Sequence, residues 1–229
     1  MEGNRSMKEI HELCNLLTGT FVADSWRSLL ELYDEAQLAT DRFQQTFVVH
    51  CPQGCGTCCE HFVPELTEAE ASLIAAYILF IKQDESLVER LRVHDGEAPC
   101  PLYDADSPYH CTVYPARGLI CRLFGACPSE DKNGSPVFRK CKYNLAIDTP
   151  VFISAQDFRD AAMPVSTMRE FGVRLSSMTG SQNPRSLAAA TIAAISQLRF
   201  IAGYLGSDSH DDDHGGAGPD VPTPTPLAS

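Results

Sequence analysis

The sequence predicts a mainly α fold, in which a helical scaffold surrounds an irregular, cysteine-rich centre. Three observations predict it. Apolar residues recur at helical spacing towards both ends of the chain. That spacing is lost over residues 95–150, where Pro, Gly, Asp and Cys are frequent. Nine of the ten cysteines lie between residues 51 and 141. So long an irregular stretch needs an organiser other than an apolar core, and the cysteines offer one.

The helices of the first part of the chain are predicted from apolar periodicity. Residues 7–48 carry apolar side chains every three or four positions, which is typical of an amphipathic helix. The pattern restarts over residues 66–82, where Thr67 and Glu70 have the spacing of a capping box. A short helix is expected near residues 84–93.

The last third of the chain is predicted to be helical again. Ser154 and Ser166 are candidate N-caps for helices over residues 155–163 and 167–178. A final helix is expected to follow Asn183 as N-cap, with a proline at its first position and a glycine at its end.

The domain organisation follows from composition. Residues 207–229 contain almost no large apolar residues and four prolines, so we expect a disordered tail there. We predict a single helical domain over residues 1–206, with the cysteine cluster region at residues 50–141.

Charge and hydropathy exclude several classes of function. The formal net charge is −12, which disfavours nucleic acid or an anionic membrane as a partner. No apolar run reaches membrane-spanning length, and the first residues lack the apolar segment of a signal peptide. We therefore expect a cytoplasmic protein. In that reducing compartment, clustered cysteines are more often metal ligands or catalytic groups than disulfides.

The clustered cysteines are the candidate metal ligands. Zinc takes four ligands, and iron–sulfur clusters use the same thiolates. Within CPQGCGTCCEHF (residues 51–62), the two-residue gap between Cys55 and Cys58 suits either metal. The candidates are Cys51, Cys55, Cys58, Cys59, Cys100, Cys111, Cys121, Cys127 and Cys141.

The adjacent pair Cys58 and Cys59 is more informative than the spacing. Side chains of neighbouring residues tend to diverge, so two adjacent ligands suit a polynuclear site or two sites that share one loop. Gly54 and Gly56 permit the tight backbone that such a loop requires. Cys14 stands apart on the first helix and is expected to be a small buried hydrophobe.

The order and neighbours of these cysteines resemble the zinc- or iron-chelating CxxCxxCC family, also called the YkgJ type. Besides the four clustered cysteines, the resemblance rests on Cys100 before Pro-Leu, Cys111, Tyr114, Arg117, Cys121, Arg122 and Phe124. It covers roughly residues 50–141. The first gap has three residues where two are usual, and Gly118 stands where proline is expected. The eighth ligand is either Cys127 or Cys141.

The resemblance implies a cytosolic metalloprotein that binds an iron–sulfur cluster, such as 4Fe–4S, or zinc or iron. Some proteins with a related signature are flagellin lysine methylases, which combine an iron–sulfur cluster with S-adenosylmethionine. One alternative is therefore a metal-dependent enzyme, carrying out S-adenosylmethionine-dependent methyl transfer or redox chemistry on a protein or peptide. Another is a structural-zinc interaction module or a metal carrier. Because the ligand-type residues exceed the four of one structural zinc, a cluster or multinuclear site is favoured.

Arg117 and Arg122 flank a cysteine and are the candidate cofactor-binding residues. A guanidinium can offset the charge of a thiolate cluster or bind a carboxylate, while the alternative is a structural salt bridge. His50, His61 and His110 lie beside cysteines or their loop, but so many thiols leave little need for imidazole. These three histidines are not predicted to be ligands.

Overall fold

The computed structural model describes residues 8, 10–12, 14–15, 18–52, 54–179 and 184–207, and the side chains of these as far as residue 203. The described part is mainly α-helical, as predicted, with two small antiparallel sheets. Its helices are α2 (Phe21–Phe47), α3 (Glu68–Ala76), α4 (Glu85–Val93), α5 (Leu119–Leu123), α6 (Ala155–Asp160), α7 (Met168–Thr179) and α8 (Leu187–Ser207). Its shorter turns are the 3₁₀ turns η1 (Thr57–Glu60) and η3 (Tyr114–Ala116) and the π-helical turn η2 (Tyr77–Lys82).

The strands are short and pair only antiparallel. They are β1 (Glu65–Leu66), β2 (Ser129–Glu130), β3 (Pro136–Arg139), β4 (Phe152–Ile153) and β5 (Arg185–Ser186). One sheet pairs β1 with β5, and the other has the order β2-β3-β4.

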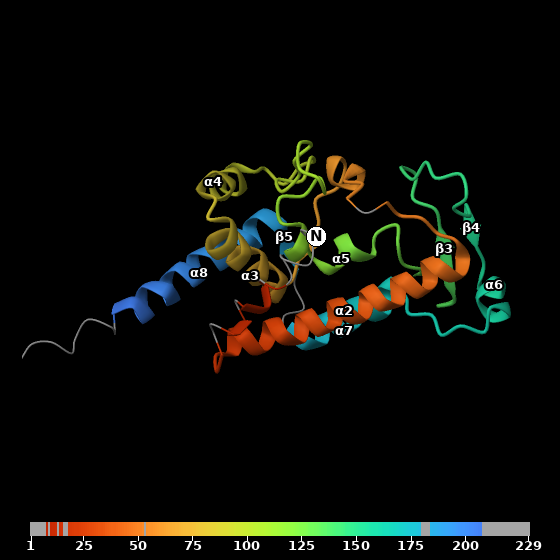
Figure 1. The fold of residues 1–229 in the computed structure, drawn as a ribbon, viewed down its shortest axis with the longest axis horizontal. Helices are drawn as coiled ribbons and strands as arrows, with labels where there is room; N and C mark the ends of the chain where they lie inside the picture. The colour runs from red at the N-terminus through yellow and green to blue at the C-terminus, as the bar shows by residue number, and fades with distance from the viewer. Residues whose placement is uncertain are drawn as a thin grey trace, which may run out of the picture.

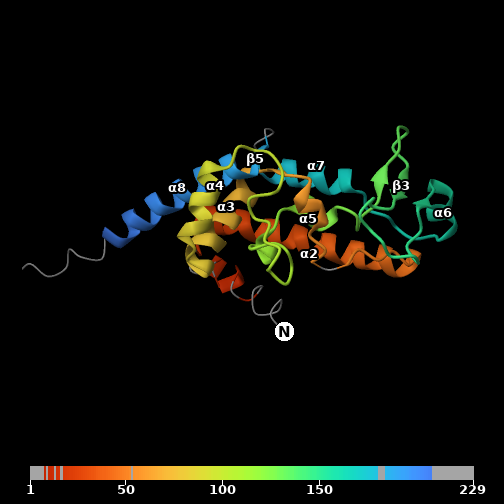
Figure 2. The same ribbon diagram turned by 90° about the horizontal axis from the view of Figure 1, so that it is seen from above.

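The long helix α2 forms the base of the molecule, and α7 packs along it (Figure 1). α3 packs against α8 at one end, and α4 adds a further layer there. The sheet β2-β3-β4 lies with α6 at the other end, while α5 lies above the middle of α2. Seen from above, α8 extends past the other helices at its C-terminal end (Figure 2).

Two groups of buried side chains hold these elements together. The larger joins α2, α3, α4, α5, α7 and α8 through residues such as Trp26, Tyr33 and Leu73. The smaller gathers aromatic rings at the far end of α2, where the centroid of the Phe43 ring lies 5.1 Å from that of Phe138 and 5.9 Å from that of Phe158. Because α2 contributes to both groups, it fixes the distance between the two ends of the molecule.

The predicted helix over residues 66–82 is α3 followed directly by η2, and its predicted capping box is confirmed. The Thr67 side chain accepts a hydrogen bond from the Glu70 amide, and the Glu70 carboxylate accepts one from the Thr67 amide. The helix predicted near residues 84–93 is α4.

The predicted N-cap Ser154 is also confirmed, because its side chain forms a capping box with Asp157 at the start of α6. α6 is shorter than predicted and ends at Asp160. Two residues later Ala162 has a φ of 51°, which is left-handed and cannot continue the helix.

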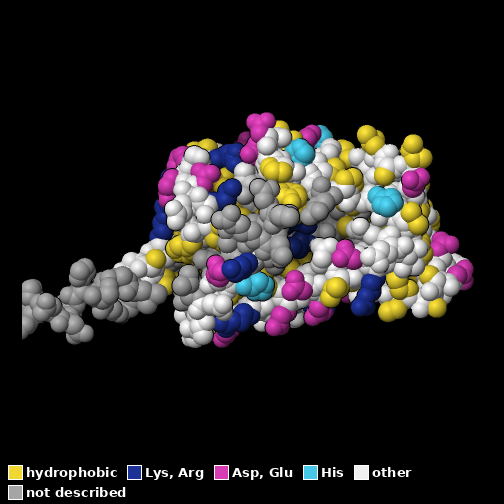
Figure 3. Space-filling view, viewed as in Figure 1, with side chains coloured by type: hydrophobic (Ala, Val, Ile, Leu, Met, Phe, Trp, Pro, Cys, Tyr) yellow, Lys and Arg dark blue, Asp and Glu magenta, His cyan; other side chains and the backbone are white. Residues whose placement is uncertain are grey.

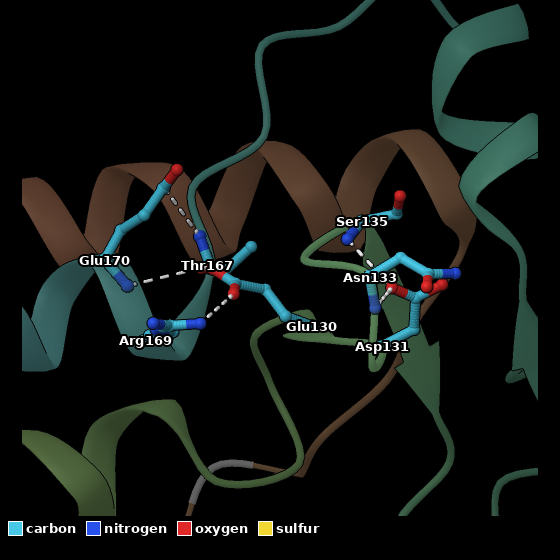
Figure 4. A network of polar contacts seen from close by, with 7 residues as sticks. All are labelled: Glu130, Asp131, Asn133, Ser135, Thr167, Arg169 and Glu170. Atoms are coloured by element: carbon cyan, nitrogen blue, oxygen red, sulfur yellow. Dashed lines mark hydrogen bonds and ion pairs between the residues drawn. The ribbon is translucent and has the colours of Figure 1, made fainter.

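For α7 the prediction of Ser166 as the cap was wrong by one residue. The Glu170 amide donates to the hydroxyl of Thr167, at 3.2 Å. The same hydroxyl donates to the carboxylate of Glu130, which also accepts a hydrogen bond from Arg169 (Figure 4). Thr167 therefore both caps α7 and ties it to β2.

The start of α8 differs from the prediction. Residues 185–186 pair as β5 with β1, with Glu65 opposite Ser186, and the helix begins at Leu187. Pro184 is therefore not at the first helical position, because the strand comes before the helix. The predicted cap Asn183 and the predicted disordered tail beyond Ser207 lie outside the described residues.

Residues 95–150 are less irregular than predicted, since they contain α5, η3, β2 and β3. The turn predicted at Asn133-Gly134 is confirmed, and it joins β2 to β3. Gly134 has a φ of 79°, and the Asp131 carboxylate accepts hydrogen bonds from the amides of Asn133 and Ser135 (Figure 4).

Acidic and basic side chains are interspersed on the face shown in Figure 3. Within the part of the chain that the structure describes, no helix combines the length and the apolar character that a membrane span needs. The expected lack of a nucleic-acid or membrane partner stays a prediction.

One buried carboxylate connects the scaffold to the cysteine-rich region. Glu70 on α3 is only 3% exposed, and one of its oxygens accepts hydrogen bonds from the amide and the hydroxyl of Thr67, both at 2.9 Å. The other accepts one from the Leu119 amide at the start of α5, at 2.8 Å. The Glu70 side chain therefore links the start of α5 to the start of α3.

Substituting Glu70→Ala is expected to lower the free energy of unfolding by about 3 kcal/mol, because buried donors lose their acceptor and each costs roughly 1–3 kcal/mol. Urea unfolding followed by circular dichroism measures it. The matched control is Glu68→Ala, an exposed carboxylate in the same helical turn, expected to change stability by less than about 0.5 kcal/mol. Equal losses in both variants would contradict the role given to Glu70.

Candidate metal centre

A cavity of about 540 Å³ collects most of the predicted ligands. It is bounded by one side of α2, by the first cysteine loop, by the segment around residues 100–115 and by α5. Seven of the nine predicted cysteines line it: Cys51, Cys55, Cys58, Cys59, Cys100, Cys111 and Cys121. Segments far apart in the sequence thus present their thiols to one space. All ten cysteines of the chain are free.

The first cysteine loop packs against residues 109–110 without room for side chains at its glycines. Gly54 and Gly56 have φ values of 72° and 69°, in the left-handed region. A Cβ on Gly56 would lie 2.2 Å from the Cβ of His110, and one on Gly54 would lie 2.9 Å from the Cα of Tyr109. Gly54 and Gly56 therefore allow both the left-handed backbone of the loop and its close approach to residues 109–110.

Hydrogen bonds fix the loop to the later cysteines. The Cys100 amide donates to the Cys59 carbonyl at 2.8 Å, so these two residues are joined through the backbone. A ring nitrogen of His110 lies 2.5 Å from the Gly54 carbonyl oxygen. The backbone of Cys111 pairs with that of Tyr103 in an isolated antiparallel β-bridge.

Cys121 is positioned by α5, whose first amide is the one bonded to Glu70. Gly118 precedes this helix, and a Cβ there would lie 2.8 Å from the Cδ2 of Leu66 and 3.1 Å from the Oε1 of Glu70, so these side chains would have to shift. A proline, which the family pattern places here, would introduce that Cβ.

Cys58 and Cys59 both lie in the 3₁₀ turn η1, and each thiol shifts the pKa of the other. The neighbouring Cys59 thiol lowers the pKa of Cys58 below its ordinary value. The same interaction raises the pKa of Cys59 well above its ordinary value.

The thiols deeper in the cavity are held neutral. Burial raises the pKa of Cys100 to about 11 and also raises the pKa values of Cys111 and Cys121. The charges of neighbouring cysteines contribute to each rise. A metal must displace these protons, so its affinity for the thiols increases with pH.

Cys51, Cys55 and Cys141 form a second group at one side of the cavity. Burial raises the pKa of Cys51 to about 11, and the charges of Cys55 and Cys141 add to the rise. A Cβ on Gly125 would lie 3.3 Å from the Cβ of Cys141 and 3.6 Å from the sulfur of Cys51. Cys141 is therefore close to the cavity, although it does not line it.

Cys127 lies apart from both groups. It is 5% exposed within the main core, and its thiol donates to the Ser166 carbonyl at 3.6 Å, on the side of α7. Burial raises its pKa to about 12, and the charge of Glu170 adds to the effect. Cys14 is buried in the same core, as predicted.

The two predicted arginines are placed differently. Arg122 donates to the carbonyls of Arg117 and Pro115 and lies over the ring of Tyr33, 4.1 Å from its centroid. Burial lowers its pKa to about 10. Arg117 lies over the ring of Tyr114 at 3.6 Å, and its buried Nε has no hydrogen-bond partner among the described residues.

The comparison with family models gives a match for the cysteine-rich part of the chain. The CxxCxxCC family, described as a "putative zinc- or iron-chelating domain", matches residues 50–142. The predicted resemblance is confirmed. Neither the comparison with curated proteins nor the comparison with solved structures gives a match. The match supports zinc or iron chelation by this CxxCxxCC segment.

The donor set of the CxxCxxCC segment fits a thiolate-bound metal. Seven thiols surround one cavity, and a guanidinium with an unpartnered nitrogen lies beside them, as a negatively charged metal–thiolate group would need. Within the described residues, no three His, Cys, Asp or Glu side chains are already gathered into a site that could hold an ion. Holding one would therefore require the cysteine side chains to turn from the cavity wall towards its interior.

Two contributions to this site were missed in the sequence. Tyr109 lines the cavity and stacks on Tyr114 with 4.5 Å between ring centroids, and no local pattern indicates this. The capping box identified Glu70 as a helix-start residue but gave no sign of its bond to α5. The His61 ring stacks on that of Tyr143, and a ring nitrogen of His110 hydrogen-bonds to the loop backbone.

Substituting Gly56→Ala tests the close approach of the first cysteine loop. Both Gly56→Ala and the control Gly134→Ala place a side chain at positive φ, which costs about 1–2 kcal/mol. Only Gly56→Ala also meets His110, adding about 1–3 kcal/mol, since nothing lies within 4 Å of a Cβ on Gly134. Urea unfolding measures the difference, and metal content of the purified protein should fall only in Gly56→Ala. Similar values for both variants would count against the packed loop.

Proposed function

We propose that the CxxCxxCC segment binds an iron–sulfur cluster, or zinc or iron, through the thiolates that line the cavity. The observation that carries the proposal is the gathering of seven thiols around one space that also contains an unpartnered guanidinium. Neutral thiols and a cation leave the cavity short of negative charge. Deprotonated cysteines on a metal would supply that charge.

The proposed ligands fall into the two groups described above. Cys58, Cys59, Cys100, Cys111 and Cys121 form the deeper group, and their charges act on one another. Cys51, Cys55 and Cys141 form the outer group. Because these thiols outnumber the four ligands that one zinc takes, a cluster or a multinuclear site is favoured over a single ion. Between the two candidates for the last ligand, its proximity to Cys51 favours Cys141 over Cys127.

The residues around the thiols hold and orient the proposed site. Glu70 fixes α5 and hence Cys121, while the glycines of the first loop allow Cys58 and Cys59 to approach residues 109–110. When bound, an iron–sulfur cluster supplies electron-transfer chemistry and zinc supplies a Lewis acid. The free cysteines and the metal-ligand role proposed for them suit a cytoplasmic protein.

Metal analysis of anaerobically purified protein tests the proposal. We expect iron with a broad absorption band at roughly 400 nm, or else zinc without colour. Cys121→Ala is expected to lose at least about half of the metal, because its sulfur lines the cavity. The matched control Cys127→Ala removes a buried thiol that lies outside the cavity, and should keep the wild-type ratio of metal to protein. Wild-type protein without stoichiometric iron or zinc would overturn the proposal.

A second candidate function is an enzyme that uses the metal together with S-adenosylmethionine, or in redox chemistry, on a protein or peptide. The size of the cavity favours it. Structural zinc sites are closed around four ligands, whereas about 540 Å³ is in the range of small-molecule sites. The same cavity volume disfavours a purely structural zinc module. A metal carrier stays an alternative.

Binding of S-adenosylmethionine to the anaerobically purified protein separates these candidates. The enzyme predicts saturable binding by calorimetry, lost in Cys121→Ala together with the metal. Adenosine alone serves as the control ligand and should bind at least about tenfold more weakly. If S-adenosylmethionine binds no better than adenosine, the methyl-transfer version is abandoned while metal binding is unaffected.

A further inference from the structure

Arg117 has a buried guanidinium donor, Nε, that no hydrogen-bond acceptor of the described residues satisfies. Its guanidinium lines the cavity, and none of the hydrogen bonds and ion pairs of the described residues involves that group. Leaving a buried donor unpartnered costs about 1–3 kcal/mol. A partner absent from the structure would recover that free energy.

The guanidinium is held so that its donors are free. One face lies on the Tyr114 ring, 3.6 Å from the centroid, and Tyr114 in turn stacks on Tyr109 with 17° between the ring planes. The N–H groups of arginine lie in the plane of the guanidinium, so stacking occupies a face and leaves the edge available. That edge suits the two oxygens of a carboxylate or phosphate.

Arg122 provides an internal contrast. Its donors are bonded to two backbone carbonyls, and its ring contact is with buried Tyr33. It therefore supports the turn that carries Arg117, whereas Arg117 is the arginine available to a ligand.

The charge of the cavity lining is unlike that of the whole protein. The chain has a net charge of −12, yet the only acidic residue among the described residues that line the cavity is Asp41, against two arginines. Asp41 already accepts a hydrogen bond from Gln37. An anion that enters the cavity therefore meets more positive than negative side-chain charge.

An aromatic pair supplies an apolar surface to the same cavity. Phe62 and Phe124 are 44% and 38% exposed, line the cavity, and stack with 11° between their ring planes. Exposed aromatic rings that border a cavity are typical of ligand-binding surfaces.

We propose that the cavity binds, beside the thiols, a small molecule with a carboxylate or phosphate on a planar apolar body, with the oxyanion held by Arg117. This deepens the proposed function, because the same cavity would hold both the metal and the ligand. Phe62 and Phe124 would contact the apolar body. A cavity with an arginine for the oxyanion and aromatic rings for the apolar body would bind an exchangeable ligand, and its role would not be structural alone.

Benzoate and phenyl phosphate are the probes, with benzamide as the uncharged analogue. Saturation-transfer NMR and calorimetry on the anaerobically purified full chain measure their affinities. We expect benzoate or phenyl phosphate to bind at least about tenfold more tightly than benzamide, and the preferred probe distinguishes carboxylate from phosphate. Arg117→Gln should remove that preference.

The matched control is Arg139→Gln, because Arg139 also lies over an aromatic ring, that of Phe152, but outside the cavity. It should leave the preference unchanged. Phe62→Ala removes an exposed ring without emptying the core, so it is informative even if Arg117→Gln fails to fold. It should weaken benzoate and benzamide alike.

Three results would overturn the inference: equal affinity for benzoate and benzamide, an unchanged preference in Arg117→Gln, or binding that disappears when the protein is loaded with metal. The last would mean that Arg117 pairs with metal-bound thiolates alone. Metal content measured on the same samples keeps the two proposals apart. Intact metal without anion binding overturns only this inference, and absent metal overturns only the proposed function.

Discussion

The buried carboxylate of Glu70 is the interaction on which the arrangement of the cavity depends. A charged group in an apolar interior is tolerated only when hydrogen bonds satisfy it, and here both oxygens are satisfied by donors from two different elements. One oxygen completes the cap of α3, and the other receives the first amide of α5. The helix that carries Cys121 is thereby fixed to the helix that forms the main core with α8. Gly118, which has no Cβ, allows the contact between Glu70 and the start of α5.

Among the described residues, basic side chains outnumber acidic ones in the lining of the cavity. Burial favours the neutral form of most of its thiols, and the one sulfur whose pKa is lowered is that of Cys58, next to its neighbour in η1. Arg117 contributes a positive charge, and no carboxylate of the described residues forms an ion pair with it. A metal bound by thiolates would balance this charge, and an oxyanion would do the same at the guanidinium edge. Both proposals therefore follow from the same shortage of negative charge in the cavity.

Local signals in the sequence were sufficient for much of the fold. The capping box at Thr67, the N-cap at Ser154 and the turn at Asn133-Gly134 each depend on residues within a few positions, and all three are present. The start of α8 was wrong because residues 185–186 pair with a strand more than a hundred residues earlier. The cap of α7 was wrong because Thr167 is selected by its bond to Glu130 as well as by its position. Such contacts between distant residues produce no periodic pattern in the sequence. The roles of Glu70 and Tyr109 depend on contacts of the same kind and therefore emerged only from the structure.

The order of the cysteines along the chain has a consequence for the biogenesis of the protein. The loop with Cys55, Cys58 and Cys59 is synthesised well before Cys121 and before the helix that Glu70 anchors. During that interval these sulfurs have neither the cavity wall nor the guanidinium of Arg117 around them, and they meet the solvent as ordinary reactive thiols. Metal acquired after α5 has docked would join segments that the chain keeps far apart, and so act as a late cross-link on the folded molecule. The supply of metal would then set how long newly made chains stay vulnerable to oxidation.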